Sequence, residues 1–138
     1  MLAFDAMVRE VRGELEEAGH PGLTVTNELA MQAIDRGADN AADLARATGV
    51  SRQAAAKTIA SLETLGYVTR AADAVDARKK HLIVTTKGHG AIDVGAAAFD
   101  AIFSRWREDT GTASGQTIEA LQRLTSSSTK RRPNRRPD

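Results

Sequence analysis

The strongest constraint on the fold is a pair of short amphipathic segments within residues 40–66, each with a residue that can cap a helix at its start and a glycine at its end. These boundary residues are Asn40, Gly49, Ser51 and Gly66. Asn and Ser accept hydrogen bonds from the free amides of a first helical turn, and glycine readily takes the left-handed conformation that ends a helix. The spacing predicts two helices joined by a tight turn, the second buried through Ala55, Ile59, Leu62 and Leu65.

Other apolar side chains recur at steps of three and four, which predicts further helices on both sides of this pair. The first two predicted helices carry Phe4, Val8, Val11, Leu15 and Ala18, and then Leu29, Ala33 and Ile34. The last two carry Ile92, Ala96, Phe99, Phe103 and Trp106, and then Ile118, Leu121 and Leu124. Thr86 is expected to cap the first of these last two.

Two β-prone segments, residues 67–70 and 81–85, directly follow the capped helix. Five of the ten residues at 71–80 between them are charged, so a hairpin with a long charged tip is predicted. The fold class is therefore mainly α with a small β hairpin. At 138 residues the chain can bury a core without disulfides or metals.

Charge is distributed unevenly along the chain. Residues 1–45 contain three basic and nine acidic side chains, whereas residues 46–87 contain eight basic and three acidic ones. A local positive zone attracts nucleic acid because binding releases the counterions held by the phosphates. Residues 126–138 combine Ser, Pro and Arg without an apolar side chain, and we expect them to be a disordered basic tail that adds either nonspecific attraction to DNA or solubility alone.

Several classes of protein are disfavoured. There is no cysteine, no apolar run of membrane-spanning length and no basic, apolar N-terminal leader, so a cytoplasmic protein without disulfides or membrane contact is expected. The sequence shows no nucleophile with a base, no paired catalytic carboxylates and no phosphate-binding glycine loop. We therefore expect neither an enzyme nor a cofactor. His20, His81 and His89 include no pair at helical spacing, so we predict no metal site and take them as ordinary surface or edge residues.

Residues 41–68, AADLARATGVSRQAAAKTIASLETLGYV, carry a specific resemblance together with Asp76-Ala-Arg78 and the set Leu82, Thr85 and Gly88. This pattern resembles the MarR family of transcription regulators. The resemblance implies one unit over residues 1–125, with a winged helix-turn-helix lobe at 24–87 and dimerisation helices at 1–20 and 88–125. It further implies a homodimeric regulator, a repressor, that binds a pseudo-palindromic operator in double-stranded DNA. Relatives bind small aromatic effectors between the dimer helices and the lobe; no residue here marks such a site.

The residues expected to contact DNA lie on the second helix of the pair and in the hairpin, or wing. On the helix they are Ser51, Arg52, Gln53, Ala54, Ala56, Lys57 and Ser61, and in the wing Arg70, Asp76, Arg78, Lys79 and Lys80. Arg52 can pair with guanine and Gln53 with adenine. Ser51, Lys57, Arg70 and Lys80 are expected to anchor phosphates. The resemblance implies that Arg78 enters the minor groove while Asp76 holds the wing in shape.

The terminal helices are too apolar for a small domain to cover alone, which predicts a second copy as partner. The predicted dimer interface consists of Phe4, Val8, Val11, Leu15, Phe99, Phe103, Trp106, Ile118 and Leu121. The aromatic members could instead line a ligand pocket. A competing hypothesis for the whole chain, motivated by acidic residues 1–45, is a winged-helix protein-interaction module without specific DNA binding. It predicts weak salt dependence of any DNA binding.

Overall fold

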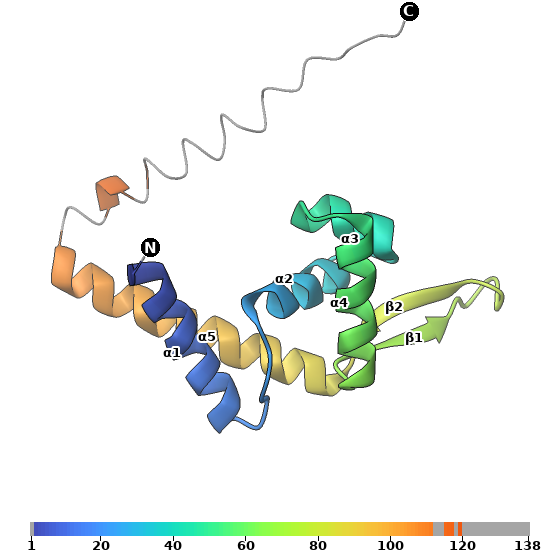
Figure 1. Ribbon diagram of the computed structural model, residues 1–138, viewed down its shortest axis with the longest axis horizontal. Coiled ribbons are helices and arrows are strands. Elements are labelled where there is room, and N and C mark those ends of the chain that lie inside the picture. The colour runs from blue at the N-terminus through green and yellow to red at the C-terminus, as the bar shows by residue number, and fades with distance from the viewer. Residues whose placement is uncertain (1, 112–114, 118, 120–138) are drawn as a thin grey trace, which may run out of the picture. The chain divides into compact units, whose positions relative to one another are not determined.

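The computed structural model describes residues 2–111, 115–117 and 119 and is mainly helical, with one small hairpin (Figure 1). The elements are α1 (Leu2–Glu17), α2 (Val25–Asp35), α3 (Ala41–Thr48), α4 (Arg52–Thr64), β1 (Val68–Ala72), β2 (Lys80–Val84) and α5 (Thr86–Thr110). The fold class predicted from the sequence is confirmed. The tail at 126–138 and the positions Ile118, Leu121 and Leu124 lie outside the described residues.

Contacts group residues 1–99 into one compact unit and residues 100–138 into a second, and α5 runs across the boundary. In the first unit, α2, α3 and α4 pack on one another, and the hairpin packs on α2 and α4. Figure 1 shows the hairpin projecting beyond α4. Residues 1–99 therefore contain the complete helix-turn-helix and its wing.

Local capping sets the boundaries of the central helices. The Asn40 side chain accepts a 3.0 Å hydrogen bond from the Asp43 amide, and the Ser51 side chain accepts one of 3.1 Å from the Ala54 amide. Gly49, between the two helices, has a φ of 74° and so lies in the left-handed region, where a side chain would be strained. The two predicted caps and the predicted glycine turn are confirmed.

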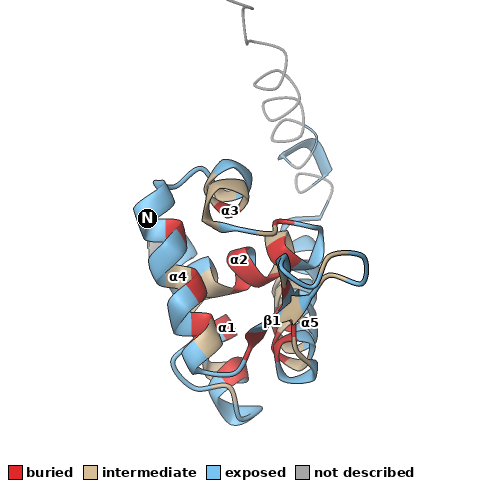
Figure 2. Cartoon of the chain, turned by 90° about the vertical axis from the view of Figure 1, so that its right-hand side faces the viewer, coloured by how far each residue is buried: buried red, intermediate tan, exposed pale blue. Residues whose placement is uncertain are grey.

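The core of the first unit lies between α4, α2 and the hairpin. The buried side chains include Met31, Ile34, Leu44, Ala55, Ile59, Leu62, Tyr67, Val68, Leu82 and Val84. In Figure 2 the buried residues of α4 face α2, and the outer side of α4 is exposed. The predicted inner face of α4 is thus confirmed for Ala55, Ile59 and Leu62. The prediction is wrong for Leu65, which is 42% exposed because it follows the last residue of the helix.

The predicted inner face of α2 is wrong in part. Ile34 is buried, but Leu29 is 53% exposed and Ala33 is only half-buried. The buried face of α2 instead contains Ala30 and Met31 beside Ile34. Leu29 and Ala33 line a groove toward α3, which explains why the sequence pattern included them.

The wing is a regular antiparallel pair in which Val68 lies opposite Val84 and Ala72 opposite Lys80. The strands differ from the predicted segments by one or two residues at their ends. Residues 73–79 connect them, so the charged tip is shorter than predicted.

The two ends of the wing meet in a junction that consists of Gly66, Tyr67, Thr85 and Gly88. The Thr85 amide donates to the Tyr67 carbonyl at 3.0 Å, and the Thr85 hydroxyl donates to the Gly66 carbonyl at 2.7 Å. The same hydroxyl oxygen accepts from the Gly88 amide at 3.2 Å. Thr85 therefore caps α5, and the prediction that Thr86 does so is wrong by one residue.

Gly88 is buried in this junction because there is no room for a side chain. A Cβ at this position would lie 2.3 Å from the Tyr67 carbonyl oxygen and 2.5 Å from Cγ1 of Val84. The backbone oxygen belongs to Tyr67, the residue directly before β1, so it cannot give way as the end of a flexible side chain could.

Glu28 is a buried carboxyl group in α2, only 3% exposed, and its Oε1 atom has no hydrogen-bond partner in the part of the chain that the structure describes. A Cβ at Gly95 of α5 would lie 2.1 Å from that oxygen, so the absence of a side chain at Gly95 makes room for the carboxyl. Burial raises the pKa of Glu28 to about 7, because removal from water disfavours the charged form.

We predict that Gly88→Ala destabilises the protein by about 1–3 kcal/mol, the usual cost of overpacking. Gly90→Ala is the matched control in the same helix, since its Cβ would approach no atom closer than 3.7 Å. Alanine at an unobstructed helical position stabilises by about 0.5–1 kcal/mol. Urea unfolding of both variants measures the difference, and equal midpoints would contradict the close contact at the junction.

We also predict that the stability of the folded protein falls as the pH rises from about 4.5 toward and beyond about 7. The folded state binds the Glu28 proton more tightly than the unfolded state, so this contribution is complete below the unfolded pKa and is lost as the pH rises through the folded one. Glu28→Gln should therefore raise the melting temperature at about pH 8 and change it little at about pH 4. Glu14→Gln, at an exposed position, is the control. If the melting temperatures of wild type and Glu28→Gln depend on pH in the same way, the raised pKa of Glu28 is refuted.

Candidate nucleic-acid interface

The outer face of α4 presents all the helix residues that were predicted to contact DNA. Ser51, Arg52, Gln53, Ala54, Ala56, Lys57 and Ser61 are exposed. Four of them are small alanine or serine side chains, so the backbone of α4 can approach a groove closely. The two longest side chains at the helix start, Arg52 and Gln53, can reach base edges there.

The N-terminus of α4 favours an anion. First-turn amides lack helical partners, and the helix dipole places partial positive charge at this end. The first turn contains no acidic residue, and Arg52 adds a full positive charge. A phosphate group is therefore an electrostatically suitable ligand for this helix end.

Carboxylates organise the wing tip. One oxygen of Asp73 accepts from the amides of Val75 at 2.6 Å and Asp76 at 3.0 Å. Asp76 Oδ1 in turn accepts from the Arg78 amide at 3.1 Å. These bonds fix the backbone that carries Arg78, while the side chains of Arg78, Lys79 and Lys80 are exposed. Minor-groove entry by Arg78 stays a prediction.

Arg70 connects the wing to the end of α4. Its Nε donates to Oε1 of Glu63 at 2.8 Å, across the gap between β1 and the last turn of the helix. Both side chains are partly exposed, and such pairs contribute about 0–1 kcal/mol. Glu63 neutralises part of the charge with which Arg70 was predicted to anchor a phosphate.

Lys87 is a structural cation that sequence analysis missed. Its Nζ donates to the Leu65 carbonyl at 2.8 Å and lies 4.5 Å from the centre of the Tyr67 ring. A cation over an aromatic face gains electrostatic stabilisation. The lysine covers the C-terminal end of α4, where the helix dipole favours positive charge.

A second missed feature is the cluster of Asp39, Asp73 and His81. Nδ1 of His81 contacts Asp39 and its Nε2 contacts Asp73. Hydrogen bonds from the histidine and from backbone amides lower the pKa of Asp73 to about 2. Hydrogen bonds to Asp73 and then to Asp39 raise the pKa of His81. His81 is thus more than the ordinary surface residue that the sequence suggested, and Asp39 is too distant in sequence for a local pattern to reveal it.

Among the residues that the structure describes, no three His, Asp or Glu side chains are arranged to hold a metal ion. Within this described part of the chain, none of the helices combines the length and the apolar composition of a membrane span.

The residues of the predicted dimer interface lie in different environments. Phe4 is 62% exposed and Phe103 is 42% exposed, whereas Val11 and Leu15 are each 1% exposed and belong to the chain's own core. Half-buried positions are Val8, Phe99 and Trp106. Phe103 and Trp106 meet edge to face, with ring centres 6.2 Å apart.

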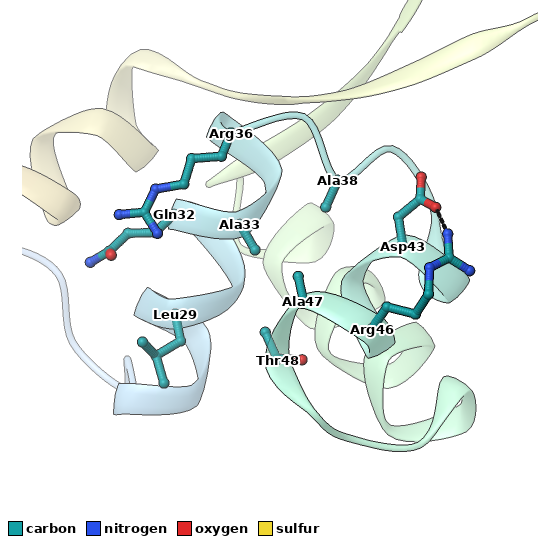
Figure 3. Close-up of a pocket in the computed structure, with 9 residues that line it drawn as sticks. All are labelled: Leu29, Gln32, Ala33, Arg36, Ala38, Asp43, Arg46, Ala47 and Thr48. Carbon is teal, nitrogen blue, oxygen red and sulfur yellow. Dashed lines mark hydrogen bonds and ion pairs between the residues drawn. The ribbon is translucent and has the colours of Figure 1, made fainter. Parts of the chain in front are cut away.

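A groove of about 600 Å³ lies between α2 and α3 (Figure 3). Asp43 and Arg46 form an ion pair on its α3 side, and Arg36 points away from that pair. The groove lies within the lobe, not between the lobe and the terminal helices, where the sequence resemblance places an effector.

An α-helical lobe with a tight glycine turn, a capped exposed helix and a two-stranded wing defines the chain as a winged-helix protein. Residues 22–79 match the model of the MarR family. Over this segment the chain is similar to the MarR family, which agrees with the resemblance seen in the sequence.

Solved structures agree with this fold. A mutant of MepR from S. aureus, bound to an oligodeoxyribonucleotide, is similar with a TM-score of 0.59 at 18% identity, covering 91% of this chain and 92% of that chain. The transcriptional regulator Tm0710 from Thermotoga maritima gives 0.59 at 23% identity, with 94% and 89% covered. BpsR from Bordetella bronchiseptica gives 0.63 at 20% identity, with 90% and 87% covered. Comparison with curated proteins gives no match.

Proposed function

We propose that the protein is a cytoplasmic transcriptional regulator, a repressor, that binds a pseudo-palindromic DNA operator as a homodimer. The observation that carries the proposal is the exposed face of α4 together with the basic wing, both attached to the same junction. The first would lie in the major groove and the second in the adjacent minor groove. No catalytic step is part of this proposal.

In the proposed complex, Arg52 and Gln53 read base edges. Ser51, Lys57, Arg70, Lys79 and Lys80 contact phosphates or flank those contacts, and Ala54, Ala56 and Ser61 allow close approach. Arg78 reads the width of the minor groove, because a narrow groove concentrates negative potential. The positioning of Arg78 by Asp76 supports this role.

The comparisons support DNA as the ligand. One structural neighbour is described as bound to an oligodeoxyribonucleotide, and another as having its DNA binding regulated by 6-hydroxynicotinic acid. We extend both properties to this chain as proposals: DNA is the partner, and a small aromatic molecule is the effector that releases it.

Homodimerisation is supported by the apolar side chains left at the surface of a single chain. Phe4 and Phe103 are the most exposed aromatic residues of the predicted interface, with Val8, Phe99 and Trp106 half-buried. A two-fold dimer would place its recognition helices at half-sites about one helical turn apart. Val11 and Leu15 would support this interface from the core, without direct contact with the partner.

We predict that the protein shifts a DNA fragment from the region upstream of its own gene, and that Arg52→Ala weakens this binding by about 1–3 kcal/mol. Arg78→Ala should also weaken binding, and the double variant should lose sequence preference. Arg36→Ala is the matched control, because Arg36 is an exposed arginine on the groove side of α2 and outside the proposed interface. Electrophoretic mobility shifts against unrelated competitor DNA measure all four proteins.

Salt dependence separates this function from the protein-interaction hypothesis. Each neutralised phosphate steepens the dependence of the logarithm of the binding constant on the logarithm of salt concentration by about 0.9. A steep slope that Arg52→Ala and Arg78→Ala reduce supports a DNA regulator. Binding that ignores sequence, depends weakly on salt and survives the double substitution would overturn it.

A further inference from the structure

His81 is one of the points at which the wing contacts the helical body through charge. Its two ring nitrogens contact two carboxylates, Asp39 at Nδ1 and Asp73 at Nε2. Ionised carboxylates only accept hydrogen bonds, so both contacts are satisfied only when both nitrogens carry a proton. A neutral imidazole has one proton and would direct a lone pair at one of the two carboxylates.

The two carboxylates belong to different parts of the lobe. Asp39 lies between α2 and α3, 42 residues before His81, and its other oxygen accepts from the Leu82 amide at 3.0 Å. Asp73 begins the wing tip, where its second oxygen holds the amides of Val75 and Asp76. The Asp39–His81–Asp73 cluster therefore connects the helical body to the strand β2 and to the tip.

We propose that Asp39, His81 and Asp73 are positioning residues that clamp the wing for DNA contact, and that the clamp opens when His81 loses its second proton. Affinity for DNA would then fall as the solution becomes alkaline. This inference rests on the proposed DNA-binding function. Its structural half, a wing that loosens with pH, can be tested without DNA.

Two successive hydrogen bonds connect the clamp to Arg78, the residue proposed to enter the minor groove. Asp73 holds the Asp76 amide, and Asp76 holds the Arg78 amide at 3.1 Å. The Asp73 amide also donates to the Lys79 carbonyl at 2.9 Å, which closes the tip. If Asp73 is released from His81, the loop that carries Arg78 loses its attachment to the helical body. The exposed basic side chains would then sample more orientations, and ordering them on DNA would cost entropy.

The charged surroundings favour the protonated state. Asp39 faces His81 from the connection before α3, and Asp73 faces it from the connection after β1. Asp43 lies behind Asp39 and accepts from the Asp39 amide, but it is paired with Arg46. Across the hairpin, the residue opposite His81 is the uncharged Ala71. Lys80, next in sequence, is the neighbouring cation that opposes protonation.

The direction of the pH effect follows from these contacts. Hydrogen bonds to Asp73 and Asp39 raise the pKa of His81 above its ordinary value of 6.5. The clamp is therefore complete below that value and is lost as the pH rises through the higher pKa of the folded state. Asp73, with its pKa lowered to about 2, stays ionised throughout this range.

Asp39→Asn is the most informative variant. Its Oδ1 can still accept from the Leu82 amide, but the amide group facing His81 no longer stabilises the positive charge. Removal of an acidic group from a DNA-binding lobe would by simple electrostatics strengthen DNA binding. The clamp predicts the opposite sign, a several-fold loss of affinity near neutral pH, together with a lower pKa for His81.

The experiment combines two readouts on the full chain. NMR of the imidazole groups gives the pKa of His81, and amide relaxation of residues 73–79 reports mobility of the wing tip, both without DNA. Mobility shifts with a fixed DNA fragment, at several values from about pH 6 to about pH 9, give the affinity. Asp39→Asn, His81→Gln and His81→Arg are compared with His89→Gln, the control for a histidine that lies near Asp35 and outside the cluster.

We expect wing mobility to rise, and affinity to fall several-fold, with a midpoint at the pKa of His81. His81→Gln should remove this pH dependence and bind weakly throughout, and His81→Arg should restore binding at high pH because guanidinium stays charged. His89→Gln should behave as wild type.

A wing that stays equally ordered through the His81 titration, or Asp39→Asn that binds as tightly as wild type, would overturn the clamp while leaving DNA binding intact. Absence of DNA binding at every pH would instead refute the proposed function, and the DNA-free measurements would still decide the clamp.

Discussion

The hydrogen bonds of Thr85 are the interaction on which the rest of the lobe depends. Its hydroxyl donates to Gly66 at the end of α4 and accepts from Gly88 in the first turn of α5, and its amide donates to Tyr67 at the start of the wing. One residue thus joins the recognition helix, both ends of the hairpin and the long helix. Gly88 makes this possible, because any side chain there would collide with the Tyr67 carbonyl. The packing of the junction therefore requires Thr85 and Gly88 at this spacing, which is also part of the family resemblance in the sequence.

The junction holds only one end of the hairpin of five-residue strands, which also packs on α2 and α4. The Asp39–His81–Asp73 cluster supplies a second attachment near the other end, by charge instead of packing. The two attachments differ physically: the junction is built from neutral hydrogen bonds and close packing, whereas the cluster depends on a proton. The wing that carries Arg78 is thus fixed at its base, whereas its tip responds to the protonation of His81.

The sequence predicted what is local and periodic. The caps Asn40 and Ser51, the turn at Gly49 and the inner face of α4 follow from residue type and helical spacing, and all are confirmed except Leu65, which is exposed. The inner face of α2 was wrong at Leu29 because spacing cannot distinguish a core face from a groove. The cluster around His81 was missed because its contact with Asp39 joins residues 42 apart, a pairing that only the folded chain creates. The DNA contacts assigned to α4 and the wing stay predictions, supported by exposure and charge.

Site-directed cleavage of DNA tests most directly whether α4 and the wing read adjacent grooves. Since the chain has no cysteine, Gln53→Cys and Arg78→Cys each provide a single attachment point for an iron chelate that cuts nearby DNA. We expect both proteins to cut one operator at two sets of sites about one helical turn apart, with the Arg78→Cys cuts in the minor groove beside those of Gln53→Cys. Gln32→Cys, in the groove between α2 and α3, should cut weakly and without pattern. Uniform cleavage by all three, or a pattern from Gln32→Cys alone, would contradict the proposed binding surface.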